Sequence, residues 1–268
     1  MKREAMLFLV AVQFLTRLPV PALAGYESSW LSQSARYIPL VGTLVGLLNV
    51  AAWWLGSLIF PPAIAIGLMM CASLLVTGAF HEDGFADACD GFGGGKAPTA
   101  VLAIMKDSRV GAYGAIGITM MLGLKWTVLA HLSPAIFAVV VIAAHTSSRW
   151  CATALIWQLA YVRADEDAKS KPLAGNLNGK DWALSGALGA AAILCLMLAI
   201  SPESITRAST LLVAALGVSL VSTFLAGAYF RGRIGGYTGD CLGATQQLAE
   251  LCFLLTALGV SAPSIPKG

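Results

Sequence analysis

The chain has 268 residues, of which 57% are hydrophobic and 12% are charged, and its mean hydropathy is +0.77. A soluble domain carries about 25% charged residues, so this composition argues against an ordinary soluble protein. The net charge of +3 is too small to indicate a nucleic-acid partner. The six cysteines lie mostly in apolar runs without a C-x-x-C pair, which argues against a disulfide framework and a zinc site.

Long apolar stretches predict the fold class, an all-α polytopic membrane helix bundle. Each stretch is close to the ~20 residues that cross a bilayer core as a helix. About seven transmembrane helices are expected, at Tyr37–Phe60, Pro62–Phe80, Gly111–His131, Pro134–Leu159, Ala183–Ile200, Thr210–Phe230 and Asp240–Val260. No long polar linker divides the chain, so residues 1–268 are expected to form a single membrane-embedded domain.

The basic residues indicate how the bundle is oriented. Most of them fall in the loops after the second, fourth and sixth spans, at Lys96, Lys106, Arg109, Arg163, Lys169, Lys171, Lys180, Arg231 and Arg233. The positive-inside rule places these loops in the cytoplasm. The first apolar segment, Ala5–Leu18, would reverse this arrangement if it crossed, so it is expected to lie in the interface or to re-enter the membrane. Residues 1–20 show no evident signal-peptide cleavage site.

The stretch Phe80–Gly95, F-H-E-D-G-F-A-D-A-C-D-G-F-G-G-G, has the most distinctive chemistry. If the preceding helix continues, Asp83, Asp87 and Asp90 fall on one stripe of it. Neighbouring carboxylates repel one another unless a cation lies between them, and hard oxygen ligands favour Mg²⁺ or Mn²⁺. Glu82 belongs to the same cluster, and Gly93 and Gly94 would let backbone N–H groups approach a phosphate. The alternative is a solvated acidic helix end followed by a flexible turn.

Three further sets of polar residues lie near or within the predicted transmembrane helices. Lys106 and Arg109 lie one helical turn apart and could clamp a pyrophosphate, with Asp107 either orienting Arg109 or acting as a base. The alternative for this pair is contact with lipid headgroups. Arg149 lies within the fourth span, where it could bind phosphate, pair with another span or snorkel to the cytoplasmic side. Lys125, in the third span, is better explained by snorkelling or an ion pair.

The last span begins with Arg233–Glu250, R-I-G-G-Y-T-G-D-C-L-G-A-T-Q-Q-L-A-E. Asp240 could supply a second carboxylate to a metal site. Gln246 is well explained as a contact between helices. Together with the basic groups, these residues suit metal-assisted displacement at phosphorus. The chain has no Walker A run and no G-x-G-x-x-G motif.

Five segments, in order, resemble the cobalamin synthase family, also called adenosylcobinamide-GDP ribazoletransferase. They are F-L-T-R-L-P-V-P (Phe14–Pro21), E-D-G-F-A-D-A-C-D-G (Glu82–Gly91), K-D-S-R-V-G-A-Y-G (Lys106–Gly114), S-R-W (Ser148–Trp150) and G-G-Y-T-G-D-C-L-G-A-T-Q-Q-L-A-E (Gly235–Glu250). The resemblance implies transfer of the adenosylcobinamide phosphate from adenosylcobinamide-GDP to α-ribazole or its 5′-phosphate, with Mg²⁺, releasing GMP. It also implies a multi-pass protein of the bacterial cytoplasmic (inner) membrane with its active site facing the cytoplasm.

The resemblance also implies roles for individual residues. The metal ligands would be Glu82, Asp83, Asp87, Asp90 and Asp240. The phosphates and the leaving GMP would be bound by Lys106, Arg109, Arg149 and Arg233, with Gly93 and Gly94. A carboxylate would take the proton from the attacking ribose hydroxyl, with Asp83 or Asp90 preferred over Asp107.

Two other functions are weighed against this one. A CDP-alcohol phosphotransferase of phospholipid synthesis also uses aspartates on membrane helices, but its D-G-x-x-A-R-x8-G-x3-D-x3-D pattern is absent. A cation transporter would be expected to show paired, broken helices in two related halves, and no such repeat is evident. The sequence leaves open the number of metal ions and the oligomeric state, a homo-oligomer included.

Overall fold

The computed structural model describes residues 2–22, 25, 27, 29–163, 177–200 and 205–261. Apart from one 3-10 turn (η1, Ala35–Tyr37), its elements are the helices α1 (Lys2–Leu15), α2 (Ser29–Ser34), α3 (Ile38–Ser57), α4 (Pro62–Thr77), α5 (Phe80–Gly94), α6 (Pro98–Lys106), α7 (Ala112–His131), α8 (Pro134–Gln158), α9 (Gly179–Ile200), α10 (Ile205–Ile234) and α11 (Gly239–Ser261). The described residues form no strand beyond one isolated bridge between Tyr161 and Tyr237. The predicted all-α bundle is confirmed.

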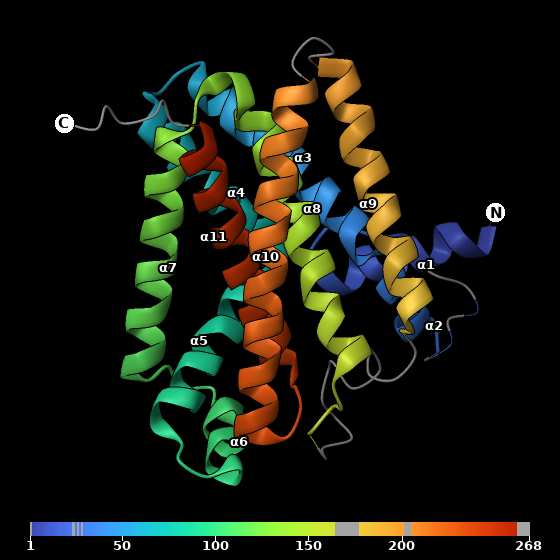
Figure 1. Ribbon diagram of the computed structural model, residues 1–268, viewed down its shortest axis with the longest axis vertical. Helices are drawn as coiled ribbons and strands as arrows, with labels where there is room; N and C mark the ends of the chain where they lie inside the picture. Colours follow the sequence, from blue (N-terminus) through green and yellow to red (C-terminus); the bar gives the residue numbers. More distant parts are fainter. Residues whose placement is uncertain are drawn as a thin grey trace.

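Helices α8 and α11 form the centre of the bundle. Both are buried along most of their length and they pack against each other. Around them, α3 and α9 pack on α8, whereas α5 and α10 pack on α11 (Figure 1). The polar residues of these two helices therefore lie inside the protein, where they need partners from neighbouring helices.

Among the described residues, six helices are long and apolar enough to cross a membrane, and the number is seven if one bent pair of helices is counted as a span. The bent pair is α4 and α5, whose axes differ by 88°, so the prediction of one uninterrupted span at Pro62–Phe80 is wrong. Gly78 and Ala79 both adopt left-handed backbone angles, with φ of 65° and 55°. Two successive left-handed residues end a right-handed helix. The acidic residues thus begin a new helix instead of extending the preceding one.

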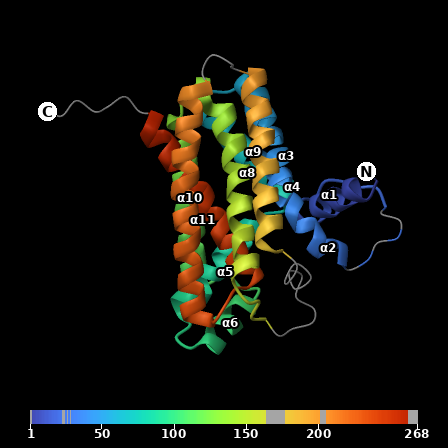
Figure 2. The same cartoon turned by 45° about the vertical axis from the view of Figure 1, so that its right-hand side comes forward.

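Helix α1 lies across the direction of the bundle helices (Figures 1 and 2). It packs against α2 and α3 and is not among the candidate spans. The backbone N–H of Arg17 donates to the carbonyl of Val76 at 2.7 Å, which fastens the end of this segment to the bend between α4 and α5. The prediction that the first apolar segment does not cross the bundle is confirmed.

The acidic helix and two of the predicted basic loops, those between α5 and α7 and between α10 and α11, lie at one end of the bundle, the lower end in Figure 1. Helix α6 lies there with the end of α5, the start of α7 and the end of α10. The bridge at Tyr161 and Tyr237 joins the segment after α8 to the start of α11, through a 3.0 Å bond from the N–H of Val162 to the carbonyl of Tyr237. Of the predicted 161–182 loop, residues 164–176 lie outside the described residues.

Candidate active site

The crossing of α5 and α11 places two sets of carboxylates next to each other. Gly84 presses its backbone against α11, since a side-chain carbon at Gly84 would lie 3.1 Å from the Cα of Asp240. Asp83 is exposed and Asp87 is half-buried, and Asp87 lies within electrostatic range of both Asp83 and Asp240. Close helix contact through glycine thus brings together three of the predicted metal ligands.

Asp240 has a cationic partner that its position in the sequence did not reveal. Arg163 Nη2 donates to Asp240 Oδ2 at 2.8 Å and to the carbonyl of Met105 at 3.1 Å. The hydroxyl of Thr238 donates to the same carboxylate at 3.3 Å. The sequence predicted only that Arg163 lies in a cytoplasmic loop after the fourth span, because nothing in it reveals the parallel bridge between Tyr161 and Tyr237 that brings this segment to α11.

Asp90 supports the start of α7. Its Oδ2 accepts a 2.7 Å hydrogen bond from the N–H of Gly111, and its Oδ1 accepts a 2.8 Å bond from the N–H of Gly114. The carboxylate is buried and satisfies N–H groups that have no acceptor within their own helix. Both oxygens therefore already have partners, and a metal or proton-transfer role for Asp90 stays a prediction.

A buried polar network connects α5, α7, α8 and α11. Lys125 Nζ lies 2.8 Å from Glu250 Oε1 and 2.6 Å from Gln247 Oε1, so the expected ion pair of Lys125 is confirmed. Gln247 Nε2 donates to Glu82 Oε1 at 2.9 Å. Gln246 Nε2 donates to Glu250 Oε2. This network holds one oxygen of Glu82, and the other, Oε2, is buried without a hydrogen-bond partner among the described residues.

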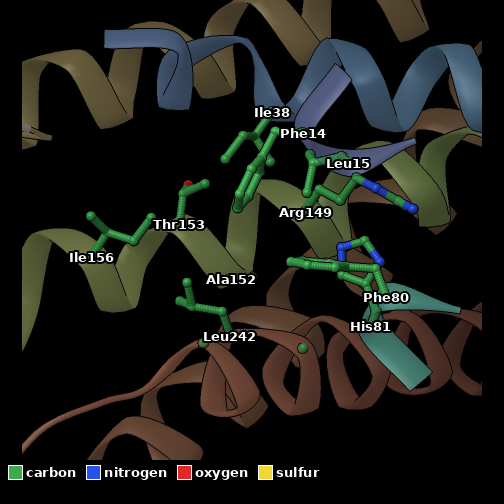
Figure 3. A pocket seen from close by; sticks show the side chains of 12 residues that line it. Phe14, Leu15, Ile38, Phe80, His81, Arg149, Ala152, Thr153, Ile156 and Leu242 are labelled. Atoms are coloured by element: carbon green, nitrogen blue, oxygen red, sulfur yellow. The ribbon is translucent and has the colours of Figure 1, made fainter. Parts of the chain in front are cut away.

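Arg149 is 2% exposed and lies at the centre of the bundle. Its Nη1 lies 3.2 Å from both His145 Nδ1 and the carbonyl of His145. Its Nε has no acceptor among the described residues. Arg149 also lines a small pocket with His81, Phe14 and other side chains (Figure 3). The predicted phosphate contact of Arg149 would therefore have to form inside the protein and not at its surface.

Lys106 and Arg109 are exposed near the end of the bundle where α5 ends. Arg109 Nε donates to both oxygens of Asp107, at 2.9 and 3.1 Å. The Arg109 guanidinium, through hydrogen bonds and its charge, lowers the pKa of Asp107 to about 2. This pairing matches the predicted orienting role of Asp107; a catalytic role as a base stays a prediction.

Arg233, Gly93 and Gly94 are occupied by contacts within the protein. Arg233 Nη2 donates to the carbonyl of Gly95 at 2.7 Å, and its Nη1 donates to the hydroxyl of Tyr229 at 2.8 Å. A side-chain carbon at Gly93 would lie 2.5 Å from the ring of Tyr113, and one at Gly94 would lie 3.3 Å from Ile104. Arg233 thus binds carbonyls at the end of α5, and the phosphate roles of all three residues stay predictions.

The donor set suits a divalent cation that is completed by its substrate. Among the described residues, no group of three or more histidines, cysteines or carboxylates is placed to hold a metal ion. Mg²⁺ commonly takes only one or two carboxylates and fills its other positions with waters and substrate phosphates. The carboxylates of Asp83 and Asp87 accept no hydrogen bond from the described residues, so their oxygens are the ones that such an ion could use.

The sequence is similar to a known protein family and to named relatives in it. A family model described as cobalamin-5-phosphate synthase matches residues 7–258. A protein of Leptothrix cholodnii named adenosylcobinamide-GDP ribazoletransferase is 46% identical, over 94% of each chain. Proteins of the same name from Shewanella frigidimarina and Vibrio parahaemolyticus are 44% and 42% identical, covering 96% and 94% of this chain and 96% and 91% of their own. No solved structure shows significant similarity.

Proposed function

The chain belongs to the cobalamin-5-phosphate synthase family, as its motifs predicted, and on that premise we propose that it is an adenosylcobinamide-GDP ribazoletransferase of cobalamin biosynthesis. In this reaction, a ribose hydroxyl of α-ribazole, or of its 5′-phosphate, attacks the phosphorus that carries the cobinamide. A new P–O bond forms, the bond to the GMP oxygen breaks, and GMP leaves. The convergence of Asp83, Asp87 and Asp240 at the α5–α11 crossing is the observation that supports this chemistry.

Each reacting group has a candidate partner in the chain. Asp83 and Asp87 would hold Mg²⁺, with Asp240 beside them paired to Arg163, and the ion would neutralise the diphosphate and the departing GMP. Lys106 and Arg109 bind the phosphates from the solvent side. Asp83 accepts the proton of the attacking hydroxyl, since both oxygens of Asp90 are bonded to α7 and Asp107 is paired with Arg109.

We place the protein in the bacterial cytoplasmic membrane with this site on the cytoplasmic side. The end of the bundle that carries α5 also carries α6, the start of α7 and the end of α10 (Figure 1). These elements and the loops beside them contain Lys96, Lys106, Arg109, Arg231 and Arg233. An excess of basic residues marks cytoplasmic loops. In this orientation, the water-soluble GDP and ribazole portions of the substrates reach the site from the cytoplasm.

The decisive experiment supplies purified protein in detergent with adenosylcobinamide-GDP and α-ribazole, with and without Mg²⁺, and measures released GMP. We expect GMP release that requires both substrates and Mg²⁺. The variant Asp83→Asn should lose this activity, whereas Asp181→Asn, at the start of α9, should retain it as a matched control. Absence of GMP, together with CMP release from a CDP-lipid and an alcohol, would favour the CDP-alcohol phosphotransferase instead. Cation flux in liposomes would favour a transporter.

A further inference from the structure

A pocket lies between the end of α1, the starts of α3, α5 and α11, and the second half of α8. Its walls are mostly apolar and are formed by Phe14, Leu15, Ile38, Phe80, Ile156 and Leu242. Arg149 and His81 place their nitrogen atoms at one end of it, and Ile156 lies at the other (Figure 3). The pocket is therefore amphiphilic, with polar groups confined to one end.

This pocket adjoins the carboxylates of the proposed reaction centre. Gly239 and Gly243 line it from α11, and Asp240 directly follows Gly239. His81 lines it from α5, two residues before Asp83. The first turns of α5 and α11 that line the pocket thus also carry Asp83 and Asp240.

The polar end contains a buried donor that has no acceptor. Arg149 is 2% exposed, and its Nη1 is directed at His145. Its Nε is buried and has no acceptor among the described residues. A buried polar group without a partner is costly, so an acceptor from a bound molecule would complete the site.

The apolar walls of the pocket limit which hydrogen-bond acceptor can bind next to Arg149. A phosphate dianion would lose its hydration among aromatic and aliphatic side chains, with Arg149 already engaged by His145, and burial of a charge that is poorly paired is expensive. A flat aromatic heterocycle instead presents apolar faces and edges to these walls. One unprotonated ring nitrogen on it would accept a single hydrogen bond.

We propose that this pocket binds the base of the acceptor nucleoside, a benzimidazole whose unsubstituted ring nitrogen accepts a hydrogen bond from Arg149 Nε. The inference rests on the proposed function, in which ribazole is the acceptor. The cavity has a volume of about 40 Å³, which is room for about three waters and less than a bicyclic base fills. Entry of the base therefore displaces the half-buried rings of Phe14 and Phe80, which meet edge to face with centroids 5.5 Å apart.

Filling the pocket tests its occupant directly. Ala152 lies on the pocket wall, and Ala152→Phe would occupy the space of the base. Calorimetry with α-ribazole should show at least about tenfold weaker binding to this variant, whereas GMP with Mg²⁺ should bind as it does to the parent protein. Unchanged α-ribazole affinity in a folded Ala152→Phe variant would overturn the assignment.

Widening the pocket gives a second test that does not depend on the folding of the first variant. In Leu242→Ala, the affinity for a nucleoside with a larger, naphthimidazole base should rise relative to the affinity for α-ribazole, compared with the parent protein. Leu248→Ala is the matched control, because Leu248 lies on the same helix but lines a different cavity. An equal shift in preference in both variants, or none in either, would contradict the proposal.

The hydrogen bond itself is tested by changing the ligand. An indole riboside replaces the acceptor nitrogen by C–H, so it should bind the parent protein about tenfold more weakly than the benzimidazole riboside. In Arg149→Met this difference should disappear, a result that a purely structural role of Arg149 would not produce. If the parent releases GMP but shows no such discrimination, the pocket assignment fails and the proposed function stands. If it neither binds α-ribazole nor releases GMP, both fail.

Discussion

Gly243 on α11 lies so close to His81 on α5 that a side-chain carbon at Gly243 would approach the His81 carbonyl oxygen to 3.0 Å. The same carbon would lie 3.2 Å from the Cα of Gly84. Backbone atoms cannot rotate away, so Gly243→Ala should force the two helices apart by a few tenths of an ångström. Asp83 and Asp240 lie on the two helices that meet at this contact, so we expect GMP release to fall at least about tenfold. We also expect the free energy of unfolding to fall by about 1–3 kcal/mol.

Gly259 supplies the control for this substitution. It lies on the same helix, is exposed, and an added carbon there would meet nothing within 4 Å. Gly259→Ala should leave GMP release unchanged and stabilise α11 by up to about 1 kcal/mol. Thermal unfolding in the same detergent distinguishes the two variants. Equal activity in both would show that the close contact does not position the carboxylates.

Asp90 should behave differently from Asp83 when its charge is removed. In Asp90→Asn, the amide N–H₂ would face the N–H of Gly111 or Gly114, which leaves one buried donor without an acceptor. We expect a loss of about 1–3 kcal/mol in the free energy of unfolding, measured by thermal or denaturant unfolding. Asp83→Asn should unfold like the parent protein and lose GMP release. If Asp90→Asn were instead as stable as the parent protein but inactive, Asp90 would have a direct role in the reaction.

The sequence predicted the helices well because a bilayer imposes a strong length and composition requirement on each span. It could not predict the 88° turn between α4 and α5. The apolar run continues through Gly78 and Ala79, so Gly78, although a common helix-ending residue, did not stand out within it, and alanine favours a helix. Their left-handed geometry is associated with contacts from residues far along the chain, since the Arg17 guanidinium packs against Gly78.

Individual residues of the candidate site were predictable from the sequence, but most of the contacts between them were not. The acidic stretch and Asp240 were identified because charges are rare in such an apolar chain. Arg163, by contrast, reaches Asp240 because the segment after α8 pairs with the start of α11 at Tyr161 and Tyr237. His81, Phe14 and Ile38 contribute to one pocket from three helices. Their convergence is a property of helix packing, which the spacing of residues within one helix does not reveal.

Lys125 and Glu250 form a buried ion pair, and we expect the removal of either charge alone to destabilise the protein. In Lys125→Met, Glu250 would lose its main positive partner while staying buried, and removal of one member of a buried pair typically costs about 3–5 kcal/mol. The double variant Lys125→Met with Glu250→Gln removes both charges and should recover much of that loss. Thermal unfolding of the parent, both single variants and the double variant measures the coupling. Additive losses would show that the two charges do not stabilise each other.

Asp107 and Arg109 provide the last prediction, which concerns pH. The pKa of Asp107 in the folded protein is lowered to about 2 by the hydrogen bonds and charge of Arg109, compared with about 3.9 for an unperturbed aspartate. A lowered pKa means that the ionised form is favoured by folding. Any stabilisation from this pair is therefore present above about pH 4 and is lost as the pH falls toward 2.

Between pH 5 and 9 Asp107 should not change its protonation state, so it should not produce the acid limb of the activity profile. Asp107→Asn should leave the pH dependence of kcat unchanged and raise KM for adenosylcobinamide-GDP by less than about tenfold, because Arg109 loses its orienting partner. Ser108→Ala, at the neighbouring exposed position, is the control. Suppose that Ser108→Ala has normal activity, whereas Asp107→Asn has a strongly reduced kcat that no longer falls at acidic pH. That result would identify Asp107 as the general base.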